Sequence, residues 1–218
     1  GMALLAAYLD RCGHPTDNTG HSFLPALQLK EAVKSLHAEG FQVHVHTIGD
    51  RGVREALDAF AGVVGAAPRG GHAVPRHHLA HVQLIHPDDV RRFAELDVAA
   101  NLQMLWACHD DQMVDLTLPV LGPERSRWQY PFADLDRAGT RLCAGSDWPV
   151  TTPDPLAAIH VGVNRTAYAA TGREGTDPFL PCQALTHERA FAAYTSGSAW
   201  INHLEDRAGV LRPGAVAD

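Results

Sequence analysis

The chain has 218 residues, which is enough for one sizeable core or two small domains. Its 25 acidic and 18 basic residues give a formal net charge of −7, and 45% of its residues are hydrophobic, as in an ordinary globular protein. It contains no basic run or basic-aromatic patch of the kind that binds nucleic acid, and no stretch near the roughly 20 apolar residues that span a bilayer.

The expected elements of the first part of the chain alternate between helices and strands. Residues 3–10 predict a short helix, and residues 27–40 predict a longer one with apolar side chains at helical spacing. Residues 41–48 alternate and are rich in β-branched side chains, which predicts a strand. A helix over 50–64 and a strand over 77–84 are expected to follow.

The second part continues the alternation. Its expected elements are a helix over 86–96, a strand over 97–105, a long connection over 106–131, a helix over 132–140, a strand over 141–150 that ends in a sharp turn, and helices over 155–169 and 186–201. The connection is too long for an idle loop and is expected to be functional. Four strands separated by helices predict an α/β fold with a parallel sheet, which is either half of an eight-stranded (β/α) barrel or a small open sheet.

Two histidines and an acid fall near the expected carboxyl ends of strands, where such barrels carry their chemistry. His46 is near the end of the first strand, His81 is within the second, and Asp147 follows the fourth. Two imidazoles and a carboxylate suit zinc or a similar divalent ion, and Asp147 could also accept a proton from bound water. The alternative is that the histidines are core residues with satisfied hydrogen bonds.

The other histidines are assigned simpler roles. His44 shares a face with His46 but is one layer deeper, where it would fill the barrel. His77 and His78 begin a strand and are expected at its edge or behind a ligand. Solvent exposure is the expectation for the histidines in loops or on helices, namely His14, His21, His37, His72, His187 and His203.

The cysteines are scattered along the chain without C-x-x-C spacing, at Cys12, Cys108, Cys143 and Cys182. This spacing supports neither a thiol redox motif nor a cysteine zinc site. Reduced thiols and the lack of a visible signal peptide predict a cytoplasmic protein.

Four segments, over 44–60, 76–103, 135–165 and 185–218, resemble the metal-dependent amidohydrolase superfamily, in the branch that contains N-substituted formamide deformylases. The segments include "HTIGDRG" and "GSDWPV". The resemblance implies that His46 and His81 are the metal ligands of barrel strands five and six. It also implies that Asp147 is the strand-eight acid, which touches the metal and serves as general base.

The resemblance further assigns substrate binding to the strand-seven segment and the neighbouring loops. Gln103 matches a glutamine of the family, and Trp106 and Trp148 are placed with it as substrate contacts. His81 is expected to assist catalysis by polarising the substrate carbonyl together with the metal, for which zinc is the expected ion.

Family members also carry an H-x-H pair on strand one, often a carboxylated lysine or an acid on strand four, and a small β-sandwich after the barrel. The chain matches none of these, so the resemblance implies that residues 1–218 form a single incomplete barrel domain of strands five to eight with their helices. An incomplete barrel leaves strand edges unpaired, which predicts a homo-oligomer such as a symmetric dimer.

The expected function is metal-dependent hydrolysis of a C–N bond in a small amide-type substrate, with no nucleic-acid or membrane partner. The alternative is a truncated, catalytically impaired fragment that folds, as an oligomer, without turnover. An open-sheet binding module unrelated to hydrolases would require the four motif segments to be coincidental.

Overall fold

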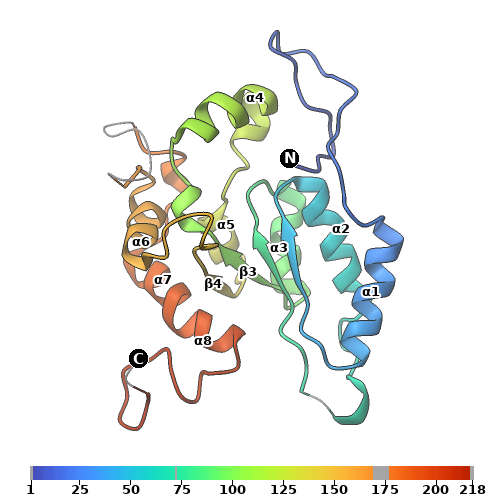
Figure 1. Cartoon of the computed structure of the whole chain (residues 1–218), viewed down its shortest axis with the longest axis vertical. Helices are drawn as coiled ribbons and strands as arrows, with labels where there is room; N and C mark the ends of the chain where they lie inside the picture. Colours follow the sequence, from blue (N-terminus) through green and yellow to red (C-terminus); the bar gives the residue numbers. More distant parts are fainter. Residues whose placement is uncertain (1, 72, 169–176, 217–218) are drawn as a thin grey trace.

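The computed structural model describes residues 2–71, 73–168 and 177–216, and its centre is a four-stranded parallel sheet (Figure 1). The strands are β1 (His44–Thr47), β2 (His78–His81), β3 (Ala99–Leu102) and β4 (Leu142–Ala144), in that spatial order. In the register, His44 lies opposite His78 and Thr47 lies opposite His81. The predicted parallel α/β sheet is therefore confirmed.

Helices connect the strands and cover the sheet. They are α1 (Ala26–Ala38), α2 (Asp50–Ala61), α3 (Pro87–Glu95), α4 (Leu118–Ser126), α5 (Phe132–Arg137), α6 (Pro155–Asn164), α7 (His187–Ala192) and α8 (Ser198–Ile201). In Figure 1, α1 and α2 lie together on the side of β1, while α6, α7 and α8 follow one another on the side of β4. No helix of the described residues combines the length and apolarity that a bilayer crossing needs.

The predicted helix over 3–10 is wrong. This segment is extended, and its backbone bonds with a later segment: the Leu4 N–H donates to Thr19 O, and the Tyr8 N–H donates to Asn18 O. An antiparallel bridge joins Leu9 to Pro15. Residues 2–20 thus form an arm, and the fully buried Leu4 anchors it in a second apolar cluster with Leu84 and Leu121, away from the main core.

Several other boundaries differ from the predictions. Each observed strand is shorter than its predicted range, because most of the flanking residues do not pair in the sheet. The predicted helix over 155–169 ends at Asn164, where Arg165 adopts a left-handed φ of 57°, and residue 169 lies outside the described residues. The expected helix over 186–201 is divided into α7 and α8 by a wider turn over Ala193–Gly197. The connection over 106–131 contains α4 and a similarly wide turn over Gln112–Thr117.

A buried carboxylate joins α2 to α3. Asp89, which is 2% exposed, accepts hydrogen bonds from Arg54 at 2.8 Å and from Arg92 at 2.8 Å. Arg92 also reaches Asp58 of α2 at 2.6 Å. Because a buried charge is stable only when it is paired and hydrogen-bonded, this network fixes the two helices that follow β1 and β2.

Two buried histidines bridge α1 and the start of β2. The Val43 N–H donates to Nδ1 of His77 at 3.1 Å, so His77 must carry its proton on Nε2, which lies 2.9 Å from Nδ1 of His37. His37 then donates from Nε2 to Ala66 O at 3.0 Å. The ring of His77 stacks on Phe60. The chain of bonds is complete only while both imidazoles are neutral, which corrects the expectation that His37 is solvated.

We expect the protein to lose stability when the pH falls below about 6.5, because burial, followed by the neighbouring His37, lowers the pKa of His77 to about 4. The folded-state pKa lies below the unfolded value, so the contribution is complete above pH 6.5 and is lost as the pH falls toward 4. The shift corresponds to about 3 kcal/mol at most. Urea denaturation at pH 7.5 and pH 5 measures it.

The matched variant is His77→Phe, which keeps a ring on Phe60 but cannot take up a proton. Its free energy of unfolding should change less between the two pH values than that of the parent protein. An equal change in both proteins would show that His77 is not responsible.

Candidate metal centre

The imidazoles of His46 and His81 meet at the carboxyl ends of β1 and β2. Nε2 of His81 lies 2.9 Å from Nδ1 of His46, and the ring centroids are 4.6 Å apart. The parallel register pairs Thr47 with His81, and His81 ends β2 with a left-handed φ of 70°, so its ring does not follow the regular alternation of the strand and reaches that of His46. Two of the three predicted ligands are therefore brought together.

His81 is held in place from two sides. Its backbone N–H donates to Oε1 of Gln103 at 2.6 Å, and its ring stacks on Trp106 at 5.1 Å with an angle of 8° between the planes. Its backbone φ is 70°, and that of Val82 is 43°. Non-glycine residues in this left-handed region carry strain, which often accompanies a functional site.

We call the group of His46, His81 and Asp147 at the carboxyl ends of the strands the rim. Its electrostatics favour a neutral imidazole at His81. Burial lowers the pKa of His81, and the adjacent His46 lowers it further, while Asp147 acts in the opposite direction. Burial first, and then His78 and the other two histidines, lower the pKa of His44 to about 4, while Asp147 again acts in the opposite direction. Neutral imidazole is the form that coordinates metals.

Asp147 lies close enough to influence both His44 and His81 electrostatically, but it does not complete a compact cluster with the histidines. It follows β4, is half-buried and has a φ of 57°. Ligand atoms of His46, His81 and Asp147 do not all lie within 4.8 Å of one another. The structure thus joins the two histidines and leaves the carboxylate nearby.

The histidine pair suits a divalent metal ion. His46 is exposed, whereas His81 is 3% exposed and its Nδ1 is buried without a hydrogen-bond partner. Imidazole nitrogens are favoured ligands of zinc and related ions. A complete site would require Asp147 or further donors to approach the pair.

The predicted substrate contacts occupy different environments. Gln103 is 4% exposed, and its amide bonds with the His81 backbone and with Asn101 Oδ1, so it supports the rim. Trp106 is half-buried against His81, whereas Trp148 is 67% exposed beside Asp147. Contact of these three residues with a substrate stays a prediction.

Two groupings of histidine were not foreseen from the sequence. His44 meets His78 at 2.7 Å, between Nδ1 and Nε2, one step below the His46–His81 pair. The available signal was the H-x-H spacing on β1 beside the H-x-x-H spacing on β2. His14 forms a separate group with Asp10 and Cys12 on the arm, and the D-x-C-x-H spacing was its signal.

The fold agrees with a comparison against protein families. The model described as "Amidohydrolase family" matches residues 3–218. This chain belongs to the amidohydrolase family.

Curated relatives of this amidohydrolase chain are much longer than the chain itself. It is 29% identical over 203 residues to the protein LONG AFTER FAR-RED 3 of Arabidopsis thaliana, covering 93% of the chain and 33% of the relative. It is 27% identical over 191 residues to the putative amidohydrolase YtcJ of Bacillus subtilis (strain 168), covering 87% and 34%. The amidohydrolase chain thus spans about a third of each of these relatives.

Two solved structures share its architecture. One is an uncharacterized metal-dependent hydrolase from Pyrococcus furiosus, with a TM-score of 0.75, 28% identity and coverage of 98% of this chain and 39% of that one. The other is an uncharacterized metal-dependent hydrolase from Pyrococcus horikoshii OT3, with a TM-score of 0.78, 26% identity and coverage of 99% and 40%. The amidohydrolase chain therefore corresponds to about two fifths of either structure, and its parallel sheet is consistent with part of a TIM-like domain.

Proposed function

We propose that this chain forms the catalytic rim of a metal-dependent hydrolase that cleaves C–N bonds in small amide-type substrates. The observation that carries the proposal is the contact between the imidazoles of His46 and His81, which meet at the carboxyl ends of neighbouring strands, with Asp147 within electrostatic reach of His81. The two Pyrococcus structures that share this architecture are described as metal-dependent hydrolases, which supports the assignment.

His46, His81 and Asp147 would hold the ion, for which we propose zinc. The chemistry that a bound divalent ion would supply is the activation of a water molecule, whose pKa falls toward about 7, and the polarisation of the substrate carbonyl. Asp147 would take the proton of the attacking water and pass it to the leaving nitrogen. His81 would keep its orientation through Gln103 and the stacked Trp106.

Substrate binding is proposed for the residues that surround this rim. Trp148 presents an exposed ring next to Asp147, and the half-buried Trp106 stacks on His81. Gln103 is proposed to contact substrate if its amide exchanges its present partners. The motifs "HTIGDRG" and "GSDWPV" support a place near the N-substituted formamide deformylases, and the four free thiols support a cytoplasmic location.

We also propose that β1 to β4 correspond to strands five to eight of a (β/α) barrel, as a single incomplete barrel domain over residues 1–218. In the described part of the chain, β1 and β4 each pair with a strand on one side only. A homo-oligomer would cover these edges. Light scattering should give a mass above that of one chain, and a stable mass of 23.5 kDa would contradict this part of the proposal.

The second candidate is a catalytically impaired fragment that folds without turnover. It is favoured by the separation of the Asp147 carboxylate from the histidine pair, which leaves two ligands in contact. A site with two protein ligands holds a metal more weakly than one with three or four.

The deciding experiment measures zinc affinity and hydrolysis of N-formyl and cyclic amides, with zinc added, for the parent protein and His81→Ala. We expect the variant to bind zinc at least about tenfold more weakly and to lose hydrolysis. His187→Ala, at an exposed position on α7, is the matched control. All three proteins carry Cys12→Ser, so that the Asp10–Cys12–His14 group does not contribute to binding. Zinc binding without hydrolysis would favour the fragment, and equal affinity in both proteins would refute the metal centre.

A further inference from the structure

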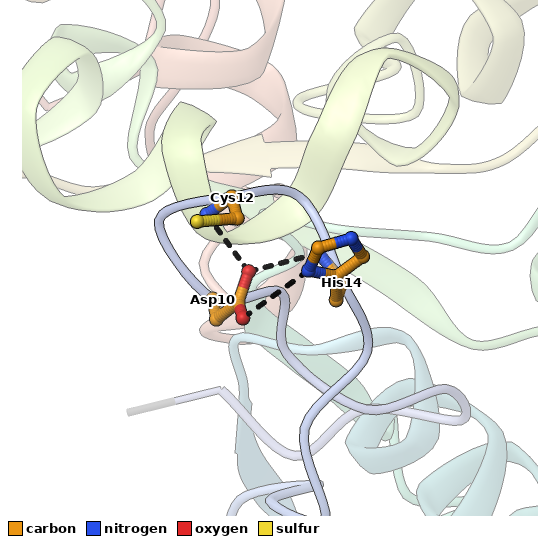
Figure 2. A group of neighbouring side chains, drawn as sticks. All are labelled: Asp10, Cys12 and His14. Atoms are coloured by element: carbon orange, nitrogen blue, oxygen red, sulfur yellow. Dashed lines mark hydrogen bonds and ion pairs between the residues drawn. The ribbon is translucent and has the colours of Figure 1, made fainter.

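A second group of metal-binding side chains lies at the tip of the arm, outside the rim. Asp10, Cys12 and His14 point toward one another from a single tight turn (Figure 2). One ligand atom from each residue, a carboxylate oxygen, a thiol sulfur and an imidazole nitrogen, lies within 4.8 Å of the other two. Among the described residues, this is the one group of three such side chains that meets this spacing.

The two oxygens of Asp10 have different roles. Oδ1 accepts hydrogen bonds from the backbone N–H of Cys12 at 2.8 Å and of His14 at 2.9 Å, which fixes the orientation of the carboxylate. Oδ2 faces the imidazole, 3.6 Å from Nδ1 of His14. The backbone thus orients the carboxylate through Oδ1, and Oδ2 faces the candidate metal ligand His14.

The turn itself is closed by backbone bonds. The Asp10 N–H donates to His14 O at 2.8 Å, and the Gly13 N–H donates to Asp10 O at 3.0 Å. Gly13 has a φ of 82°, a conformation that glycine adopts without strain. Leu9 extends this attachment to the body of the protein, because its N–H donates to Val120 O of α4. The donors are therefore held near one another before any ion arrives.

The chemistry of the donors favours a particular class of ion. The backbone N–H of His14, more than any other group, lowers the pKa of Asp10, so the carboxylate is charged at neutral pH. Cys12 is exposed and free of any disulfide. Sulfur and imidazole ligands suit zinc and cobalt, whereas magnesium and calcium prefer sets made of oxygen.

We propose that Asp10, Cys12 and His14 form a second metal site that holds one zinc-class divalent ion, with solvent completing the coordination. On binding, the Cys12 thiol releases its proton to solvent and coordinates as thiolate. The ion links the two sides of the turn and thereby stabilises the arm. This site is independent of the proposed hydrolase, because none of its residues belongs to the rim.

Titration of the protein with cobalt(II) tests the proposal, since a cysteine ligand produces a sulfur-to-cobalt charge-transfer band in the near ultraviolet. His46, His81 and Asp147 contain no sulfur and cannot produce it. We expect one equivalent of cobalt to saturate the band, zinc to displace it, and the apparent affinity to fall as the pH is lowered. Cys12→Ser should abolish the band, and Asp10→Asn and His14→Ala should each weaken cobalt binding about tenfold or more.

Cys182→Ser is the matched control, because Cys182 is the other exposed cysteine of the described residues and should leave the titration unchanged. Circular dichroism of each variant without metal shows whether the fold is retained. A band that persists in Cys12→Ser would overturn the proposal. So would parent affinity in both Asp10→Asn and His14→Ala, because the thiol would then bind cobalt without its neighbours.

Discussion

Asp147→Asn is expected to lower kcat/KM for the proposed amide hydrolysis by about 100-fold or more, because an amide cannot take the proton of the attacking water. The substitution preserves the size of the side chain and its place after β4. Hydrolysis of one N-formyl substrate with zinc added measures the effect. Asp17→Asn, which changes an exposed carboxylate on the arm, controls for the loss of one negative charge.

Zinc affinity is a second measurement, which tests the role of Asp147 without requiring turnover. If Asp147 also contacts the ion, the variant should bind zinc about tenfold more weakly when both proteins carry Cys12→Ser. Hydrolysis and zinc affinity that both match those of Asp17→Asn would remove Asp147 from the site. A loss of affinity in a chain that shows no turnover would retain Asp147 as a ligand and favour the impaired fragment.

Phe60→Ala is expected to lower the free energy of unfolding by about 3–5 kcal/mol, the usual cost of removing a large core side chain. Phe60 is fully buried in the main core on α2, and its ring stacks on His77 with centroids 4.9 Å apart. Alanine would leave a cavity beneath the bridge between His77 and His37. Urea denaturation at pH 7.5 measures the loss.

Phe23→Ala is the matched substitution, because Phe23 is 98% exposed. Its effect should stay within about 0.5 kcal/mol. Similar values for the two variants would mean that the arrangement around Phe60 is not the one present in solution.

Much of the fold follows from local patterns in the sequence. Alternating β-branched residues in 41–48 and helical spacing in 27–40 are signals that depend on neighbouring residues alone, and both elements formed. The helix predicted over residues 3–10 was wrong, because a run of alanine and leucine is typical of a helix although this segment is extended. What decides their conformation is the pairing of Leu4 and Tyr8 with Thr19 and Asn18, which no local pattern reveals.

The candidate site, like the fold, could be predicted from the sequence in part. His46 and His81 could be placed together because parallel strands end at one edge of the sheet, and the motif around each supported the choice. The contact of Gln103 with the His81 backbone depends on the left-handed turn at His81, and the stacking of Trp106 depends on how the chain leaves β3. Both are properties of three-dimensional packing.

The carboxylate of Asp89 has a consequence for the rim, although it lies on a helix. It ties α2, which follows the strand of His46, to α3, which follows the strand of His81. Neither helix can detach without leaving a buried charge unpaired, so the two strand–helix units should open and close as one cooperative body. Local fluctuations of the molecule would then carry both imidazoles together and preserve their spacing.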